Sequence, residues 1–239
     1  MDLSRRRLNL SSAFLIFALA TGYFFLLLYT LYPFLKTHWT FNGATYWFIT
    51  GYFLFISLFM VAILGVFAEG GRNCETIARG LHLRRLTRSD WYWAVGSLFG
   101  LLILTGVMFG LSAVSHAVFE TRQLNTTPWF MHMEPFKGAD RWLLLLWFPM
   151  FFFNIVGEEI LWRGYIQSRL DMRYGWIACA LFWLGFHIPF GFDLLLILLP
   201  TMFVIPFAFH KTKNTSVTIF IHGMFNGPMF IAVALGLLE

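Results

Sequence analysis

Long apolar runs separated by short polar gaps make up most of this chain. Seven runs contain no Asp, Glu, Lys or Arg, namely residues 8–35, 37–68, 91–119, 142–157, 174–192, 194–210 and 214–238. A helix of about 20 apolar residues crosses a bilayer. The fourth run is short, but its helical pattern continues through Glu158, Glu159 and Arg163 to about Leu170. The pattern predicts an all-α polytopic transmembrane helical bundle of about seven spans, within a range of six to eight.

Two of these runs leave alternatives open. The first follows the basic residues Arg5 to Arg7 like a signal peptide, but its length indicates an uncleaved span. The sixth carries Pro200 and Pro206, so it is either a kinked span or a re-entrant segment.

Composition excludes a soluble or disordered protein. Hydrophobic residues make up 59% of the chain and charged residues only 12%, against about 25% charged residues in soluble domains. The net charge of +5 does not indicate nucleic-acid binding, because the basic residues lie in the gaps between apolar runs. Cys74 and Cys179 have no CxxC partner, and we interpret both as free thiols.

The distribution of Lys and Arg predicts the orientation. Thirteen of them lie at the N-terminus and in alternate gaps, against four on the other side. Since positive residues stay in the cytoplasm, we expect a cytoplasmic N-terminus and an external C-terminus. The segment 69–90 is then a cytoplasmic basic loop, either an ordinary one or an amphipathic stretch with Ile77, Leu81 and Leu86 resting on the membrane.

Three spans carry polar side chains where such groups are costly and indicate function. These side chains are Glu158 and Glu159 in the fourth span, His187 in the fifth, and His222 and Asn226 in the seventh. A rise of about 1.5 Å per residue places them about 12–18 Å from the predicted cytoplasmic helix ends. We therefore expect them to meet at nearly one level, while His210 lies at the boundary.

Spacing within the helices suggests how these groups are divided. Glu159 and Arg163 are four residues apart, in the order that favours an ion pair. Glu158 points about 100° away from Glu159, so it can face the shared centre. His222 and Asn226 are also four residues apart and share a face.

This set of groups suits amide hydrolysis. A carboxylate beside an imidazole can activate water, and a second imidazole with an amide can donate to an oxyanion. Two His and two Glu are also possible zinc ligands, although the HExxH motif is absent. Alternatively, the ion pair and the polar residues only hold helices together.

In their order along the chain, these residues resemble the motifs of the CPBP family, the CAAX-protease and bacteriocin-processing membrane peptidases, also called ABI proteins. The matching residues are EExxxR at Glu158, Glu159 and Arg163, an aromatic residue four positions before His187, and HxxxN at His222 and Asn226. The segments EEILWRGYI and KTKNTSVTIFIHGMFNG look like the first and last motifs with their surroundings. One departure is Trp183, where the family commonly has Phe.

The resemblance implies a glutamate-dependent intramembrane endopeptidase with catalytic groups on spans four, five and seven. It implies that Glu158 and His187 activate water, that His222 and Asn226 bind the oxyanion, and that Glu159 acts beside them with Arg163 in support. It implies no metal or other cofactor, with zinc as the alternative. We expect one integral membrane domain over 1–239, in which N-terminal spans (1–140) precede a catalytic core (141–239).

The expected partners are the lipid bilayer and a membrane-associated protein or peptide substrate. A prenylated tail, a bacteriocin leader, a pheromone and a sorting signal all fit, in a membrane that is expected to be prokaryotic. Two other classes stay open. One is a non-catalytic bacteriocin-immunity or scaffold protein, and the other is a transporter with a buried proton relay, which would usually show repeat symmetry.

Overall fold

The computed structural model describes residues 7–131 and 134–237. Its helices are α1 (Leu10–Leu26), α2 (Tyr32–His38), α3 (Gly43–Ala68), α4 (Cys74–Gly80), α5 (Arg88–Phe119), α6 (Leu143–Phe152), α7 (Gly175–Phe186), α8 (Phe192–Thr212) and α9 (Thr215–Ala234). A π-helical turn joins α1 to α2, and π- and 3-10-helical turns extend α6 into a longer segment, Gly138–Arg169. We call this segment the central helix.

The number and positions of the apolar helices match the sequence pattern. Six segments are long and apolar enough to cross a membrane, namely Leu10–His38, Gly43–Ala68, Arg88–Phe119, Gly138–Arg169, Phe192–Thr212 and Thr215–Ala234. The seventh, Gly175–Phe190, is apolar but shorter. Each predicted run corresponds to one of these segments. The predicted all-α polytopic bundle is confirmed, and the chain is a multi-pass membrane protein.

The sixth apolar run forms one unbroken helix. Pro200 and Pro206 both lie inside α8, so the re-entrant alternative is wrong. The preceding helix is short because α7 ends at His187, where a 3-10 turn containing Pro189 begins. Gly191 then reverses the chain into α8 with a φ of +91°, which glycine adopts readily. This turn holds His187 at the end of α7.

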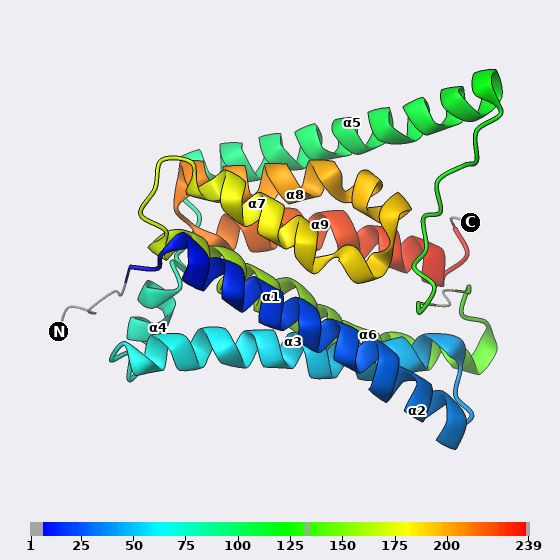
Figure 1. Cartoon of the computed structure of the whole chain (residues 1–239), viewed down its shortest axis with the longest axis horizontal. Coiled ribbons are helices and arrows are strands. Elements are labelled where there is room, and N and C mark those ends of the chain that lie inside the picture. Colours follow the sequence, from blue (N-terminus) through cyan, green and yellow to red (C-terminus); the bar gives the residue numbers. More distant parts are fainter. Residues whose placement is uncertain (1–6, 132–133, 238–239) are drawn as a thin grey trace.

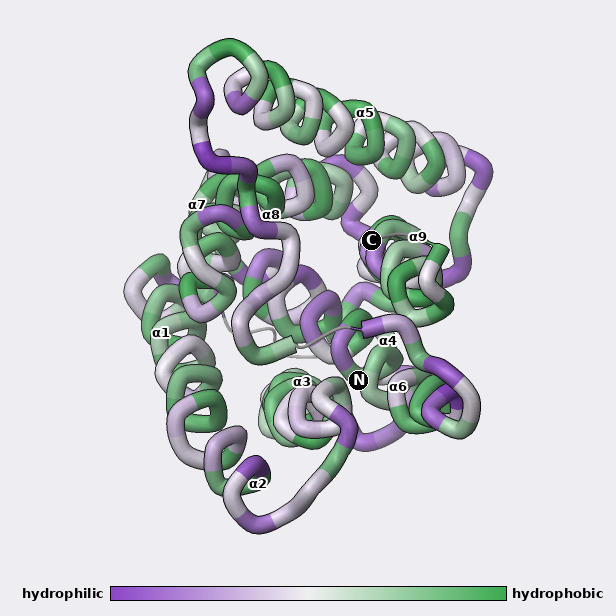
Figure 2. The backbone as a smooth tube through the Cα atoms, turned by 90° about the vertical axis from the view of Figure 1, so that its right-hand side faces the viewer, coloured by the Kyte–Doolittle hydropathy of each residue, from purple (hydrophilic) through white to green (hydrophobic). Residues whose placement is uncertain are grey.

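Other helices pack around the part of the central helix that carries Glu158 and Glu159, whereas Leu145 and Phe148 nearer its start are exposed. In Figure 1, α7, α8 and α9 lie between α5 on one side and α1, α3 and α6 on the other. Figure 2, which views the helices end-on, shows α5 at the outer edge of the bundle. Only 11% of the most apolar stretch of α5 is buried, so most of its surface is available to lipid. By contrast, the central helix packs against α3, α7 and α9.

The segment 69–90 docks onto one end of the bundle. The carbonyl of Leu81 accepts a hydrogen bond from Oγ1 of Thr215 at 2.6 Å, and the carbonyl of His82 accepts one from the N–H of Thr215 at 3.0 Å. Leu81 is 0% exposed, so the alternative that it rests on the membrane is wrong. Its side chain fills the core, while Ile77 and Leu86 are half-buried.

Two arginines that were counted in the orientation argument are buried. Arg169 pairs with Glu69 at 2.6 Å, and their side chains are 1% and 3% exposed. Arg163 is likewise buried. Because both arginines are held by other residues of the protein, their positions do not indicate which side of the membrane is cytoplasmic. Setting two of the thirteen aside leaves eleven against four, so the orientation stays a prediction with the same sign.

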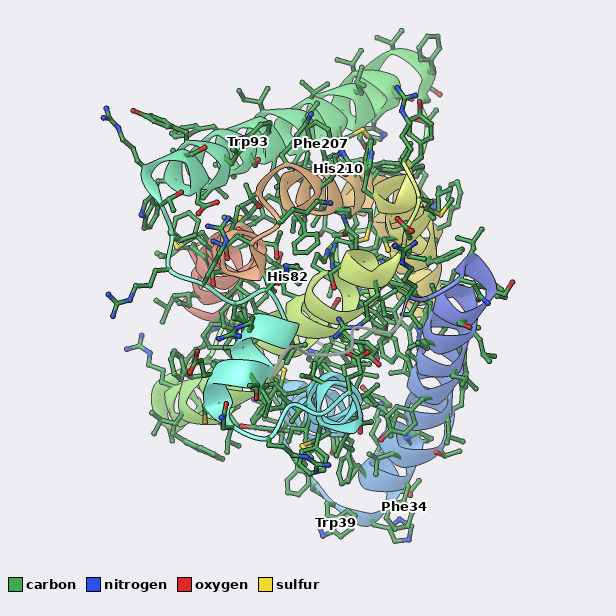
Figure 3. The ribbon with its side chains drawn as sticks, turned by 90° about the vertical axis from the view of Figure 1, so that its left-hand side faces the viewer. Phe34, Trp39, His82, Trp93, Phe207 and His210 are labelled. Carbon is green, nitrogen blue, oxygen red and sulfur yellow. The ribbon has the colours of Figure 1, made fainter. Side chains whose placement is uncertain are left out.

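His210 lies apart from the other polar groups of the spans, as its position suggested. Its ring stacks on Phe207 with 6.4 Å between centroids, and Phe207 contacts Trp93 of α5 at 6.0 Å (Figure 3). His82 contacts Phe209 edge-on at 5.9 Å. These contacts are aromatic packing between α5, α8 and the docked segment.

Candidate active site

The central helix changes its winding around the two glutamates. Wide π-helical turns lie before Glu158 (Phe153–Gly157) and after Glu159 (Ile160–Ile166). Turns of this kind are rare in proteins, and those that occur often lie at functional sites. Gly157 allows a close approach to α3, because a Cβ there would lie 2.8 Å from a backbone carbonyl of that helix.

Glu159 contacts an arginine on its own helix and a histidine on another helix. Its Oε1 lies 3.3 Å from NH1 of Arg163, which is the ion pair expected from their spacing. The same oxygen lies 2.9 Å from Nδ1 of His222 on α9. All three residues are buried. The structure therefore brings His222 to Glu159, a contact that the sequence did not indicate.

Arg163 is held by charge and by an aromatic ring. None of its three nitrogens has a hydrogen bond of ordinary geometry within the described ranges, 7–131 and 134–237. Its guanidinium carbon instead lies 3.6 Å from the centroid of the Trp183 ring. A cation over a tryptophan face is attractive, most strongly where water is excluded. Trp183 and Glu159 thus hold the buried positive charge between them.

Glu158 has separate partners, as its different direction suggested. Its Oε1 accepts a hydrogen bond from Nδ2 of Asn154 at 3.1 Å. Its Oε2 accepts one from Nε1 of Trp162 at 3.3 Å and one from Nε1 of Trp183 at 2.7 Å. Glu158 is 2% exposed, and its carboxylate accepts hydrogen bonds from neutral donors only.

The hydrogen bond of His187 defines its tautomer. Its Nδ1 lies 2.9 Å from the carbonyl oxygen of Trp183, one helical turn earlier. A carbonyl can only accept, so Nδ1 carries the proton. In the neutral imidazole, Nε2 then keeps a free lone pair. Nε2 of His187 can therefore accept a proton, or a hydrogen bond that water donates.

Glu158 and His187 are linked through Trp183. No direct hydrogen bond joins them in the part of the chain that the structure describes. Instead, the indole of Trp183 donates to Glu158 while its backbone carbonyl accepts from His187. Trp183 therefore connects the two groups.

Asn226 lies one turn beyond His222 on α9. It is half-buried, whereas the other predicted site residues are buried. Its side-chain amide has no hydrogen bond to any residue that the structure describes. The structure therefore groups Glu159, Arg163 and His222 by direct contact and leaves Asn226 at the more open edge.

The arrangement does not present an evident metal centre. Among the described residues, no group of three or more His, Cys, Asp or Glu side chains is placed to hold a metal ion. Glu159 is already engaged by Arg163 and His222. The metal-free chemistry predicted from the sequence stays a prediction.

Three residues at the site were missed as partners, namely Asn154, Trp162 and Trp183. The first two lie four residues before and four after Glu158, so helical spacing already placed them on its face. Trp183 was noted only as a departure from a related motif. An indole in a buried span needs an acceptor for its N–H, and this need was the available signal.

Part of the chain matches a known protein family. Residues 140–227 match the family model described as "Rce1-like: Type II CAAX prenyl endopeptidase Rce1-like". This range includes all six predicted site residues and less than half of the chain. No curated protein and no solved structure matches the chain.

Proposed function

Since residues 140–227 match the model of the Rce1-like CAAX endopeptidases, in the CPBP family, we propose that this chain is an intramembrane endopeptidase. It hydrolyses a peptide bond in a membrane-associated protein or peptide. The observation that carries the proposal is that Glu158, His187 and His222, all buried and on three helices of the matched segment, each contact Trp183. Buried ionisable groups in a span mark function by default.

Water is activated between Glu158 and His187. Nε2 of His187 has a lone pair, since Nδ1 donates to a carbonyl. One of these groups takes a proton from water as the oxygen attacks the peptide carbon. The proton is then delivered to the leaving nitrogen, giving a carboxylate and a free amine. General-base catalysis of this kind contributes about 10²–10⁴-fold.

The oxyanion is stabilised by His222 and Asn226. The amide of Asn226 supplies N–H donors. His222 can donate from Nε2 when both of its ring nitrogens are protonated, and the Glu159 carboxylate accepts from Nδ1. Glu159 therefore acts through His222, and Arg163 holds Glu159 in place. No step requires a metal ion.

Substrate reaches the site past Asn226. This residue is the half-buried member of the set, and Met229, three residues further along α9 and on the same face, is exposed. A flexible apolar side chain such as Met adapts to varied partners. An apolar or lipid-modified peptide could therefore approach from the bilayer along this side of α9.

Comparative peptidomics tests the proposed function. Membranes from cells that express the wild-type chain, the E158Q variant or no protein are compared at equal protein abundance. We expect a set of cleavage products with the wild type that is absent with E158Q, and these products would identify the substrate. Identical peptide profiles in all three samples would contradict the peptidase and favour a non-catalytic scaffold or immunity protein.

A further inference from the structure

Trp183 lies at the centre of the candidate active site. Its indole N–H donates to Glu158 at 2.7 Å, and its carbonyl accepts from His187 at 2.9 Å. Its ring lies 3.6 Å from the guanidinium of Arg163 and 5.6 Å from the ring of His222. Trp183 is 0% exposed, so these contacts are fixed by packing on all sides.

The bonds to Glu158 leave one acceptor position free. An ionised carboxylate offers about four lone-pair sites over its two oxygens. Trp162 and Trp183 occupy two on Oε2, and Asn154 occupies one on Oε1. The free position therefore lies on Oε1, which becomes the oxygen that can contact water.

Trp183 makes the stronger of the two indole contacts. Its N···O distance is 2.7 Å, against 3.3 Å for Trp162. Hydrogen bonds to charged groups are the short and strong ones. An indole nitrogen donates only, so the direction of this bond cannot reverse. The bond keeps Oε2 turned toward the two indoles and leaves Oε1 facing the free acceptor position.

The backbone of the same residue orients the second group. The carbonyl of Trp183 fixes the Nδ1–H tautomer of His187 and directs Nε2 away from α7. Because both bonds come from one residue, the relative placement of Oε1 of Glu158 and Nε2 of His187 depends on Trp183. A phenylalanine, which is common at this position in the related motif, has a ring for Arg163 but no donor for Glu158.

Building on the proposed peptidase function, we propose that Trp183 is a positioning residue for hydrolysis. Its indole N–H holds the Glu158 carboxylate in register with the His187 imidazole, so that one water molecule contacts both. This residue never touches the substrate in this scheme. It acts on the rate of the chemical step, not on substrate affinity.

The first test needs no substrate. In purified full-length protein with ¹⁵N-labelled tryptophan, the indole signal of Trp183 is identified by its loss in W183F. We expect this signal to lie downfield and to move upfield in E158A, while E75A, on the exposed surface of α4, leaves it in place. A signal that does not respond to E158A would overturn the proposed hydrogen bond.

The second test separates positioning from binding. Cleavage of an internally quenched farnesylated CAAX peptide is measured for the wild type, W183F and the control W176F on the same helix. We expect W183F to lower kcat by about 10–100-fold, as for loss of a hydrogen bond to a charged group, with KM unchanged. The acidic limb of its pH–rate profile also shifts. W176F behaves as the wild type, and a wild-type kcat in W183F would overturn the proposal.

Two further results keep the outcomes distinct. If W183F unfolds, replacing residue 183 by 3-benzothienylalanine keeps the shape and removes only the N–H, and the same loss of kcat is expected. If the wild type cleaves neither this peptide nor any native membrane peptide, the proposed function fails and the positioning role fails with it. The indole–carboxylate bond is still decided separately by the ¹⁵N measurement.

Discussion

Nδ1 of His222 lies 2.9 Å from Oε1 of Glu159, and both side chains are buried inside the bundle. An ionised carboxylate can only accept, so the imidazole nitrogen donates. The same carboxylate faces the guanidinium of Arg163 at 3.3 Å. One oxygen thus ties α9 to the central helix and balances a buried positive charge. Glu159 is therefore expected to matter for stability as well as for activity.

The variant E159Q should be less stable than the wild type. Gln keeps the size of Glu159 but removes the ion-pair partner of the buried Arg163. Breaking a buried pair in this way costs about 3–5 kcal/mol in free energy of unfolding. Thermal melting in one detergent should show a clearly lower Tm, with lower cellular abundance. A melting curve that matches the wild type would mean that Arg163 has found another partner.

The variant E158Q, by contrast, should keep its stability and lose its activity. Glu158 is bound by neutral donors, and the Gln carbonyl can still accept from Trp162 and Trp183 while Asn154 turns its amide. We expect a Tm near that of the wild type and a fall in cleavage of about 10²–10⁴-fold, the size of a lost general base. The measurement is the initial rate at equal protein concentration. A well-folded E158Q variant that cleaves at the wild-type rate contradicts the proposed role of Glu158.

Local patterns predicted the spans and one ion pair. Each apolar run became a helical segment, because a polypeptide in lipid must satisfy its backbone groups within helices. The pair between Glu159 and Arg163 followed from their four-residue spacing alone. These features depend on neighbours along one helix, which the sequence displays directly.

Contacts between distant segments were beyond such patterns. Leu81 looked like a lipid-facing residue in a basic loop, yet it is buried where its carbonyl meets Thr215. The contact of Glu159 with His222 joins residues 63 positions apart. Depth arguments predicted a common level for these groups, but the rotation of each helix about its axis decides which of them touch.

Asn226 and His222 should differ in their effect on stability. The amide of Asn226 is half-buried and makes no side-chain hydrogen bond within residues 7–131 and 134–237, so N226A should leave the Tm nearly unchanged. H222A removes a partner of Glu159 and should lower the Tm. Both should reduce kcat, by about 10²-fold or more, through loss of an oxyanion donor. Full activity in N226A would remove Asn226 from the mechanism.

Chelation provides a direct test of the metal-free mechanism. Glu159 is engaged by Arg163 and His222, and Nδ1 of His187 by a carbonyl, so these groups already have partners without a metal. We expect metal content well below one ion per chain and unchanged cleavage after dialysis against EDTA. A stoichiometric zinc content, with activity lost on chelation and restored by zinc, would instead make Glu158, His187 and His222 ligands.

Labelling of cysteine tests the orientation. The chain has two cysteines, of which Cys74 is exposed at the start of α4 and Cys179 is buried in α7. A membrane-impermeant maleimide should therefore report on Cys74 alone. The bias of basic residues places α4 in the cytoplasm, so Cys74 should be labelled in inverted vesicles or lysed cells and protected in intact cells. C74S provides the control for background, and a reporter fused after α9 should register outside. Ready labelling of Cys74 in intact cells would reverse the orientation, and the Arg-rich segment 69–90 would then face away from the cytoplasm.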